Sequence, residues 1–99
     1  MRVHTESVQF KADQKLIQYI EKRLNKMDQF FDRIIEARVT LKLENSGQVR
    51  DKIAEVRISV PGDQLIAKEA SKTFEASVDN ATSALKRQLI RYKERMRKA

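Results

Sequence analysis

Basic side chains near the end of this sequence are the residues best placed to do chemistry. From residue 85 to residue 99 the chain carries seven cations and a single anion, Glu94. The cations are Lys86, Arg87, Arg91, Lys93, Arg95, Arg97 and Lys98. This segment therefore holds +6 of the formal net charge of +7 over all 99 residues. Positive charge at this density attracts polyanions, so polyanion binding is favoured over the alternative of a merely solvated helix face.

The side chains that catalysis would need are poorly represented. The sole histidine, His4, lies on the polar face of a predicted strand without a Cys or Ser partner at a suggestive spacing. Asp28 and Asp32 could form a carboxylate pair, but capping and turn roles are favoured for both. The chain has two glycines and no cysteine, and its carboxylates lack the spacing of a calcium loop. We expect no enzymatic activity, cofactor, metal or small-molecule substrate.

Two predicted elements open the chain, and each is amphipathic. Residues 2–8 alternate as a short strand, with Val3 and Thr5 on one face. Asp13 is a good N-cap for a helix that follows it. The apolar arc of this helix consists of Leu16, Ile17, Ile20, Leu24 and Met27. Opposite it lies a basic stripe of Lys15, Tyr19, Lys22 and Lys26, with Arg23 at its edge. One side of the helix is therefore predicted to cover a sheet and the other to face solvent.

Three further strands are predicted in the middle of the chain. Residues 34–44 alternate, and their core face comprises Ile35, Ala37, Val39, Leu41 and Leu43. Residues 45–48 (Asn-Ser-Gly-Gln) have turn chemistry. The next strand directs Ala54, Val56, Ile58 and Val60 inward. Pro61 and Gly62 fit the central positions of a type II turn, and a short strand of ambiguous phase follows over residues 64–69.

The last element is predicted as a long helix from Thr73 to Lys98. Its apolar stripe consists of Phe74, Val78, Ala81, Leu85, Leu89, Tyr92 and Met96. The cations divide around this stripe, with Lys86, Lys93 and Arg97 on one flank and Arg87, Arg91 and Lys98 on the other. The order β-α-β-β-β-α predicts an α+β two-layer sandwich, in which two helices cover one face of a four-stranded sheet. The chain length suits a single domain over residues 1–99.

The sequence also bears on the kind of polyanion. No apolar run is long enough to cross a membrane. A basic amphipathic helix could lie on an anionic membrane, but its apolar stripe is needed to cover the sheet. Phe10, Phe30, Phe31 and Phe74 fall at positions typical of the core or its edge, so no aromatic platform for unpaired bases is evident. Tyr19 could stack a base or be an ordinary surface tyrosine. We expect a cytoplasmic protein that binds structured RNA by shape and phosphate contact.

Two segments resemble the ribosome hibernation promoting factor family. The first is Lys-Met-Asp-Gln-Phe-Phe-Asp-Arg-Ile at residues 26–34. The second combines Ala-Ser-Val-Asp at 76–79 with Leu-Lys-Arg-Gln-Leu at 85–89, followed by Arg91 and Lys93. Neither segment is strongly specific alone, but their separation and the order of elements also resemble the family over nearly the whole chain.

The resemblance implies a fold similar to double-stranded-RNA-binding domains and a factor that occupies the decoding channel of the small ribosomal subunit. Translation would stop in slow growth, because the factor overlaps the paths of mRNA and of A- and P-site tRNA. The matching basic positions, expected to contact ribosomal RNA, are Arg23, Lys26, Arg87, Arg91 and Lys93. Lys22 and Lys86 are added from the helical wheel rather than from the family. A position that is basic in some relatives is Ala84 here.

The chain resembles a short form, because it ends with the second helix. Long forms pair two ribosomes through an extra C-terminal domain, and the Y-type inhibitor has an acidic tail. We therefore expect no dimerisation of ribosomes by this chain alone through that route, although a second hibernation factor could act as a partner. Two alternatives remain open: a general double-stranded-RNA binder, and a regulatory protein–protein adaptor, since relatives are also described as sigma-54 modulators.

Overall fold

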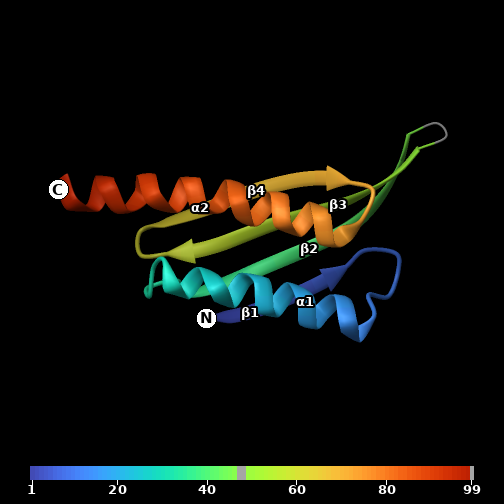
Figure 1. Ribbon diagram of the computed structural model, residues 1–99, viewed down its shortest axis with the longest axis horizontal. Coiled ribbons are helices and arrows are strands. Elements are labelled where there is room, and N and C mark those ends of the chain that lie inside the picture. The colour runs from blue at the N-terminus through green and yellow to red at the C-terminus, as the bar shows by residue number, and fades with distance from the viewer. Residues whose placement is uncertain (47–48, 99) are drawn as a thin grey trace.

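The computed structural model describes residues 1–46 and 49–98 and forms one sheet with two helices on a single face (Figure 1). The elements in order are β1 (Arg2–Ser7), α1 (Gln14–Asn25), a short 3-10 helix η1 (Lys26–Gln29), β2 (Glu36–Ser46), β3 (Val49–Val60), β4 (Asp63–Ser71) and α2 (Phe74–Lys98). The strands lie in the order β1-β2-β3-β4, with β1 parallel to β2 and the other pairs antiparallel. In Figure 1, α1 crosses in front of β1 and β2, and α2 crosses in front of β3 and β4. The predicted two-layer fold is confirmed.

The core lies between the helices and the inner face of the sheet. Alternate residues of the central strands are buried there, including Val39, Leu41 and Val56. Ile20 of α1 and Leu85 of α2 are fully buried against them. Because each such side chain contributes roughly 1.5–3 kcal/mol when it leaves water, the apolar stripes of the helices are committed to the sheet. The charged flanks of the helices are therefore held at fixed places on the surface.

The ends of α1 decide where the chain next meets α2. The Asp13 Oδ1 accepts a hydrogen bond of 2.8 Å from the backbone N–H of Leu16, which confirms the predicted N-cap. At the other end, η1 tightens the helix, and the backbone N–H groups of Phe30 and Phe31 both donate to the Met27 carbonyl, at 3.0 and 3.2 Å. This tight ending leaves Phe30 40% exposed, while Met27 is buried.

Side-chain hydrogen bonds fix α2 along its length. Thr73 caps it, because its Oγ1 accepts from the Ala76 backbone N–H at 3.1 Å. The buried Ser77 hydroxyl lies 2.6 Å from the Lys52 carbonyl of β3 and 3.1 Å from the Thr73 carbonyl, the shorter contact being the stronger bond. Two turns before the end, the Tyr92 hydroxyl donates to the Pro61 carbonyl at 2.6 Å. These bonds set the rotation of the helix, and thereby the direction in which each charged flank faces.

Two apolar predictions at the ends of elements are wrong. Ile35 is 61% exposed and Ile34 is buried, because β2 begins at Glu36 and its inward alternation starts with Ala37. Met96 is 50% exposed, because the end of α2 extends beyond the sheet (Figure 1). A helical wheel continues a stripe whether or not a neighbouring element is there to cover it.

The turns and the fourth strand have mixed outcomes. Gly62 has φ +79, as position i+2 of a type II turn requires, and it connects the paired residues Val60 and Asp63. In β4, Leu65 and Ala67 are buried, which settles the phase that the sequence left ambiguous. Of the turn predicted at 45–48, the first two residues belong to β2, and residues 47–48 lie outside the described part of the chain.

Candidate nucleic-acid interface

The first group of candidate cations surrounds a small cleft between the two helices. We call it the inter-helix cleft, a space of about 150 Å³ lined by Arg23, Lys26, Met27, Phe30, Thr82, Ser83 and Lys86. Two of its cations come from α1 and η1, and the third comes from α2. Residues more than fifty positions apart in the sequence are thus brought to one point of the surface. Three cations around one cleft are suited to an anion such as a phosphate.

A second group lies on the opposite flank of α2, beside the edge strand β4. We call it the arginine groove, an open space of about 520 Å³ lined by Leu65, Ala84, Arg87, Gln88, Arg91 and Arg95. Its three arginines recur every fourth residue and lie one above another on the helix. Gln88 fixes this flank, since its Nε2 donates to the Ile66 carbonyl at 2.8 Å. The predicted Arg87 and Arg91 lie together here, and Ala84 contributes no charge.

Arg95 was not predicted as a site residue, although it belongs to the arginine groove. Its Nη2 lies 3.5 Å from the Asp63 Oδ2, an exposed and therefore weak ion pair. The spacing of four from Arg87 through Arg91 could have identified it from sequence.

Phe30 organises two cations of α2. The Lys86 ammonium lies over its ring, with Nζ 4.3 Å from the ring centroid. The Lys93 Nζ donates to the Phe30 carbonyl at 2.8 Å. The ring and the carbonyl of one residue thus hold Lys86 and Lys93 on the same flank of α2. The prediction that Phe30 lies at the core or its edge is wrong, because Phe30 is 40% exposed. Phe10 stacks on Phe74, and the Phe31 ring meets Tyr92 edge to face.

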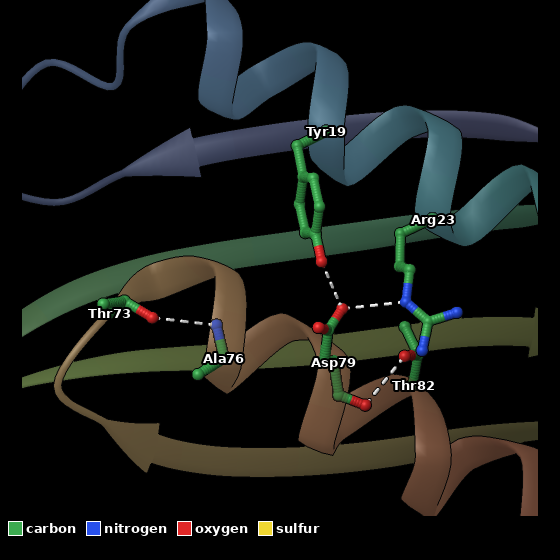
Figure 2. A network of polar contacts seen from close by, with 6 residues as sticks. All are labelled: Tyr19, Arg23, Thr73, Ala76, Asp79 and Thr82. Carbon is green, nitrogen blue, oxygen red and sulfur yellow. Dashed lines mark hydrogen bonds and ion pairs between the residues drawn. The ribbon is translucent and has the colours of Figure 1, made fainter.

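An acidic residue, Asp79, joins the two helices inside this basic surface. Figure 2 shows Tyr19 and Arg23 reaching from α1 to one carboxylate oxygen of Asp79 on α2. The Tyr19 hydroxyl donates to Oδ1 at 2.7 Å, and the Arg23 Nε donates to the same oxygen at 2.8 Å. Tyr19, Lys22, Arg23, Lys26 and Asp79 line one shallow pocket. Tyr19 faces α2 rather than open solvent, so the structure favours a helix-linking role over a free stacking surface.

The contacts of Asp79 keep it ionised. Partial burial alone would raise its pKa, but the hydrogen bonds from Tyr19 and Arg23 and the charges of Arg23 and Lys26 outweigh burial and lower the pKa below 3.8. The same hydrogen bond raises the pKa of Tyr19 above 10.0, with smaller contributions from burial and the Asp79 charge. At neutral pH the contact is therefore a neutral phenol and a guanidinium on a carboxylate.

His4 and Asp28 each lie beside a charged group from another part of the chain. The exposed His4 has its Nε2 3.7 Å from the Glu36 Oε2. Asp28 accepts from the Met1 amino group at 3.0 Å, a contact that the prediction of a capping or turn role did not include. Within residues 1–46 and 49–98, no cluster of His, Asp and Glu is arranged to hold a metal ion. Over the same residues, no helix has the length and apolar content to span a membrane.

The fold and its charges place this chain among small α+β domains with a basic helical face. A family model described as "Sigma 54 modulation protein / S30EA ribosomal protein" matches residues 3–97, and the chain belongs to this family. Its curated relatives are named ribosome hibernation factors. One from Deinococcus radiodurans is 35% identical over 82% of this chain and 43% of its own length. One from Azotobacter vinelandii is 28% identical over 96% of this chain and 85% of its own length. The chain thus spans less than half of the Deinococcus relative.

Solved structures share the fold. A ribosomal subunit interface protein from Coxiella burnetii superposes with a TM-score of 0.85 at 21% identity, covering 95% of this chain and 99% of that one. The N-terminal domain of Protein Y from Thermus thermophilus gives 0.80 at 25% identity, covering 93% and 99%. The order of elements is therefore shared along almost the entire chain.

Proposed function

We propose that this chain is a cytoplasmic ribosome hibernation factor, acting as one domain over residues 1–99. It binds the small ribosomal subunit in the decoding channel, where it overlaps the paths of mRNA and of A- and P-site tRNA and so inhibits translation in stationary phase or stress. Membership of the family and the printed names of the relatives support a role on the ribosome. The observation that carries the proposal is the concentration of unbalanced positive charge on the helical face.

The two faces of the domain differ in how their charges are compensated. On the outer face of the sheet, Arg38 pairs with Glu36 at 3.4 Å, and Arg57 pairs with Glu55 at 4.0 Å. On the helical face, Arg23 pairs with Asp79 and Arg95 pairs with Asp63. Arg87 and Arg91 of α2 make no ion pair within the described residues. A polyanion gains most where it meets uncompensated cations and releases its counterions. The helical face is therefore the surface that we propose turns toward ribosomal RNA.

The proposed RNA contacts follow the two groups of cations. The residues are Arg23, Lys26, Arg87, Arg91 and Lys93, with Lys22 and Lys86 completing the surface. Arginine forks bind phosphate oxygens in pairs, whereas lysines act as mobile point charges. Such contacts fix orientation on a folded RNA without reading its sequence, which suits a factor that blocks a channel by occupying it.

Sedimentation of lysate from stationary-phase cells tests the proposal. The chain should migrate with small subunits and whole ribosomes at physiological salt, and should be lost from them as salt is raised. In a translation assay, purified protein should compete with mRNA and with A- and P-site tRNA. Absence from ribosomal fractions at physiological salt would refute the proposal.

Binding and sedimentation measurements also separate this proposal from its two alternatives. A general double-stranded-RNA binder would bind an unrelated RNA duplex as tightly as the small subunit. A regulatory adaptor, which the sigma-54 part of the family description favours, would remain in a stoichiometric protein complex after nuclease treatment. We further propose that ribosome dimers containing this chain also contain a second hibernation factor, which mass spectrometry of the dimer fraction would detect.

A further inference from the structure

Asp79 is the residue that charge alone explains least. It is an ionised carboxylate beside Arg23 and Lys26, on the face proposed to meet a polyanion. By Coulomb's law it should repel a phosphate that approaches this face. Yet two side chains from α1 converge on it, and both bond to the same oxygen.

The geometry of the Arg23 contact leaves its phosphate-binding end available. A guanidinium has five N–H donors, and Asp79 takes only the one on Nε. Within the described residues, this is the only hydrogen bond of the Arg23 side chain. The four donors on the two terminal nitrogens form the fork that matches two phosphate oxygens. A carboxylate bound at Nε therefore holds the arginine from behind without occupying that fork.

The Arg23 side chain that Asp79 holds lies at the inter-helix cleft. It lines this cleft together with Lys26 and Lys86, and Ser83 adds a hydroxyl to the same wall. Lys86 is itself held by the Phe30 ring. The cleft thus contains an arginine and a lysine whose long side chains are ordered before any ligand arrives. Ordering a flexible side chain in advance removes an entropy cost from binding.

We infer that Asp79 is a positioning residue that fixes the Arg23 guanidinium for an RNA backbone phosphate in the inter-helix cleft, so that an acidic side chain strengthens the binding of a polyanion. The inference rests on the proposed function for its ligand class, and it names one residue pair and one phosphate within that interface. Tyr19 assists, because its hydroxyl holds the shared Asp79 oxygen from the other side. The negative charge of Asp79 by itself would weaken RNA binding, whereas its positioning of Arg23 strengthens RNA binding.

Substitution of Asp79 distinguishes these signs. Asp79→Asn and Asp79→Ala each raise the net charge by one, so a purely electrostatic surface would bind RNA more tightly in both variants. Positioning predicts weaker binding, by about two- to tenfold for Asp79→Ala, the range for ordering one long side chain. Asp79→Asn should lie between wild type and Asp79→Ala, since its amide oxygen still accepts from Arg23. Glu75→Gln is the matched control, because it removes an exposed carboxylate one turn earlier on α2.

Binding is measured by fluorescence anisotropy at physiological salt with two probes, purified small ribosomal subunits and a 20-base-pair RNA duplex. Weaker binding by Asp79→Ala, with Glu75→Gln equal to or tighter than wild type, is the expected result. In an Arg23→Met background, Asp79→Ala should cause no further loss, whereas a general structural defect would persist. Circular dichroism melting checks that each variant is folded at the assay temperature.

The two proposals fail in different ways. If the wild type binds the duplex but not the subunits, the proposed role on the ribosome is refuted. The positioning role of Asp79 can then still be tested with the duplex. Equal or tighter binding by Asp79→Ala, or a loss that persists without Arg23, overturns the positioning role while the ribosomal role stands. Binding of the wild type to neither probe overturns both.

Discussion

The salt dependence of ribosome binding should count the phosphates that the helical face neutralises. Seven candidate cations lie on this face, and each phosphate neutralised contributes about 0.9 to the slope of log affinity against log salt. If all seven are engaged, the slope is about −6.3, and doubling the salt weakens binding by roughly 80-fold. Replacing Arg87 and Arg91 by Gln should reduce the slope to about −4.5, so that the same doubling costs roughly 20-fold.

The structure gives this pair a matched control. Arg87 and Arg91 are exposed beside the arginine groove, so their replacement should leave the core and the melting temperature nearly unchanged. Arg38 and Arg57 are also exposed and are cross-strand partners on the outer face of the sheet. The double variant Arg38→Gln/Arg57→Gln removes the same two charges from the opposite side of the domain. It should keep the wild-type slope.

Anisotropy titrations with labelled protein and purified small subunits, at salt from 100 to 300 mM, measure these slopes. A wild-type slope in the Arg87→Gln/Arg91→Gln variant would refute their assignment as phosphate contacts. Equal losses in the helical and the sheet variant would show that binding depends on total charge and not on this face.

Three further predictions concern the core, the cleft and the charge network. Leu85→Asp should unfold the domain in circular dichroism, because it buries an unpaired charge at a position with no exposure, and a native spectrum would contradict the packing. Phe30→Leu should weaken subunit binding by about two- to fivefold while Phe30→Tyr retains it, because the cation–π contact that holds Lys86 contributes on the order of 0.5–1 kcal/mol at an exposed site. The stability that Asp79 gains from Arg23 is present above its ordinary pKa of 3.8 and is lost as the pH falls through the lowered value in the folded protein. The difference in melting temperature between wild type and Asp79→Asn should therefore shrink as the pH falls below 3.8, and a difference that stays constant from pH 7 to pH 3 would contradict this contribution of the Asp79–Arg23 pair.

Local periodicity was sufficient to predict most of the fold. Alternation in β2 and β3 predicted their inward faces, and Asp13 marked the start of α1, because these signals depend on neighbours within a few positions. Ile35 and Met96 were assigned wrongly for a common reason. Both lie at the end of an element, where burial depends on whether another element extends that far.

The candidate site also has one part that could be predicted from sequence and one part that could not. The cations of both helices could be listed from sequence, because charge is a property of each residue. The arrangement of these cations could not be predicted from sequence, because it depends on contacts between residues far apart in the chain. Asp79 contacts Tyr19 and Arg23, and Phe30 contacts Lys93, over separations of 56 to 63 positions. A wheel drawn for one helix does not contain the other helix. The wheel therefore predicts Tyr19 as a base-stacking or an ordinary surface tyrosine, and the apolar pattern predicts Phe30 at the core or its edge.

These inter-helix contacts join the stability of the domain to its proposed binding. Asp79 of α2 bonds to Arg23 of α1, and Phe30, which follows η1, contacts Lys86 and Lys93 of α2. A change in the packing of the two helices would move Arg23 relative to Lys86 without altering the number of positive charges. Among relatives of equal net charge, affinity for RNA should therefore follow the residues at positions 30 and 79. Net charge governs the rate of encounter with RNA, and the packing of α1 on α2 governs how much of that charge reaches a phosphate.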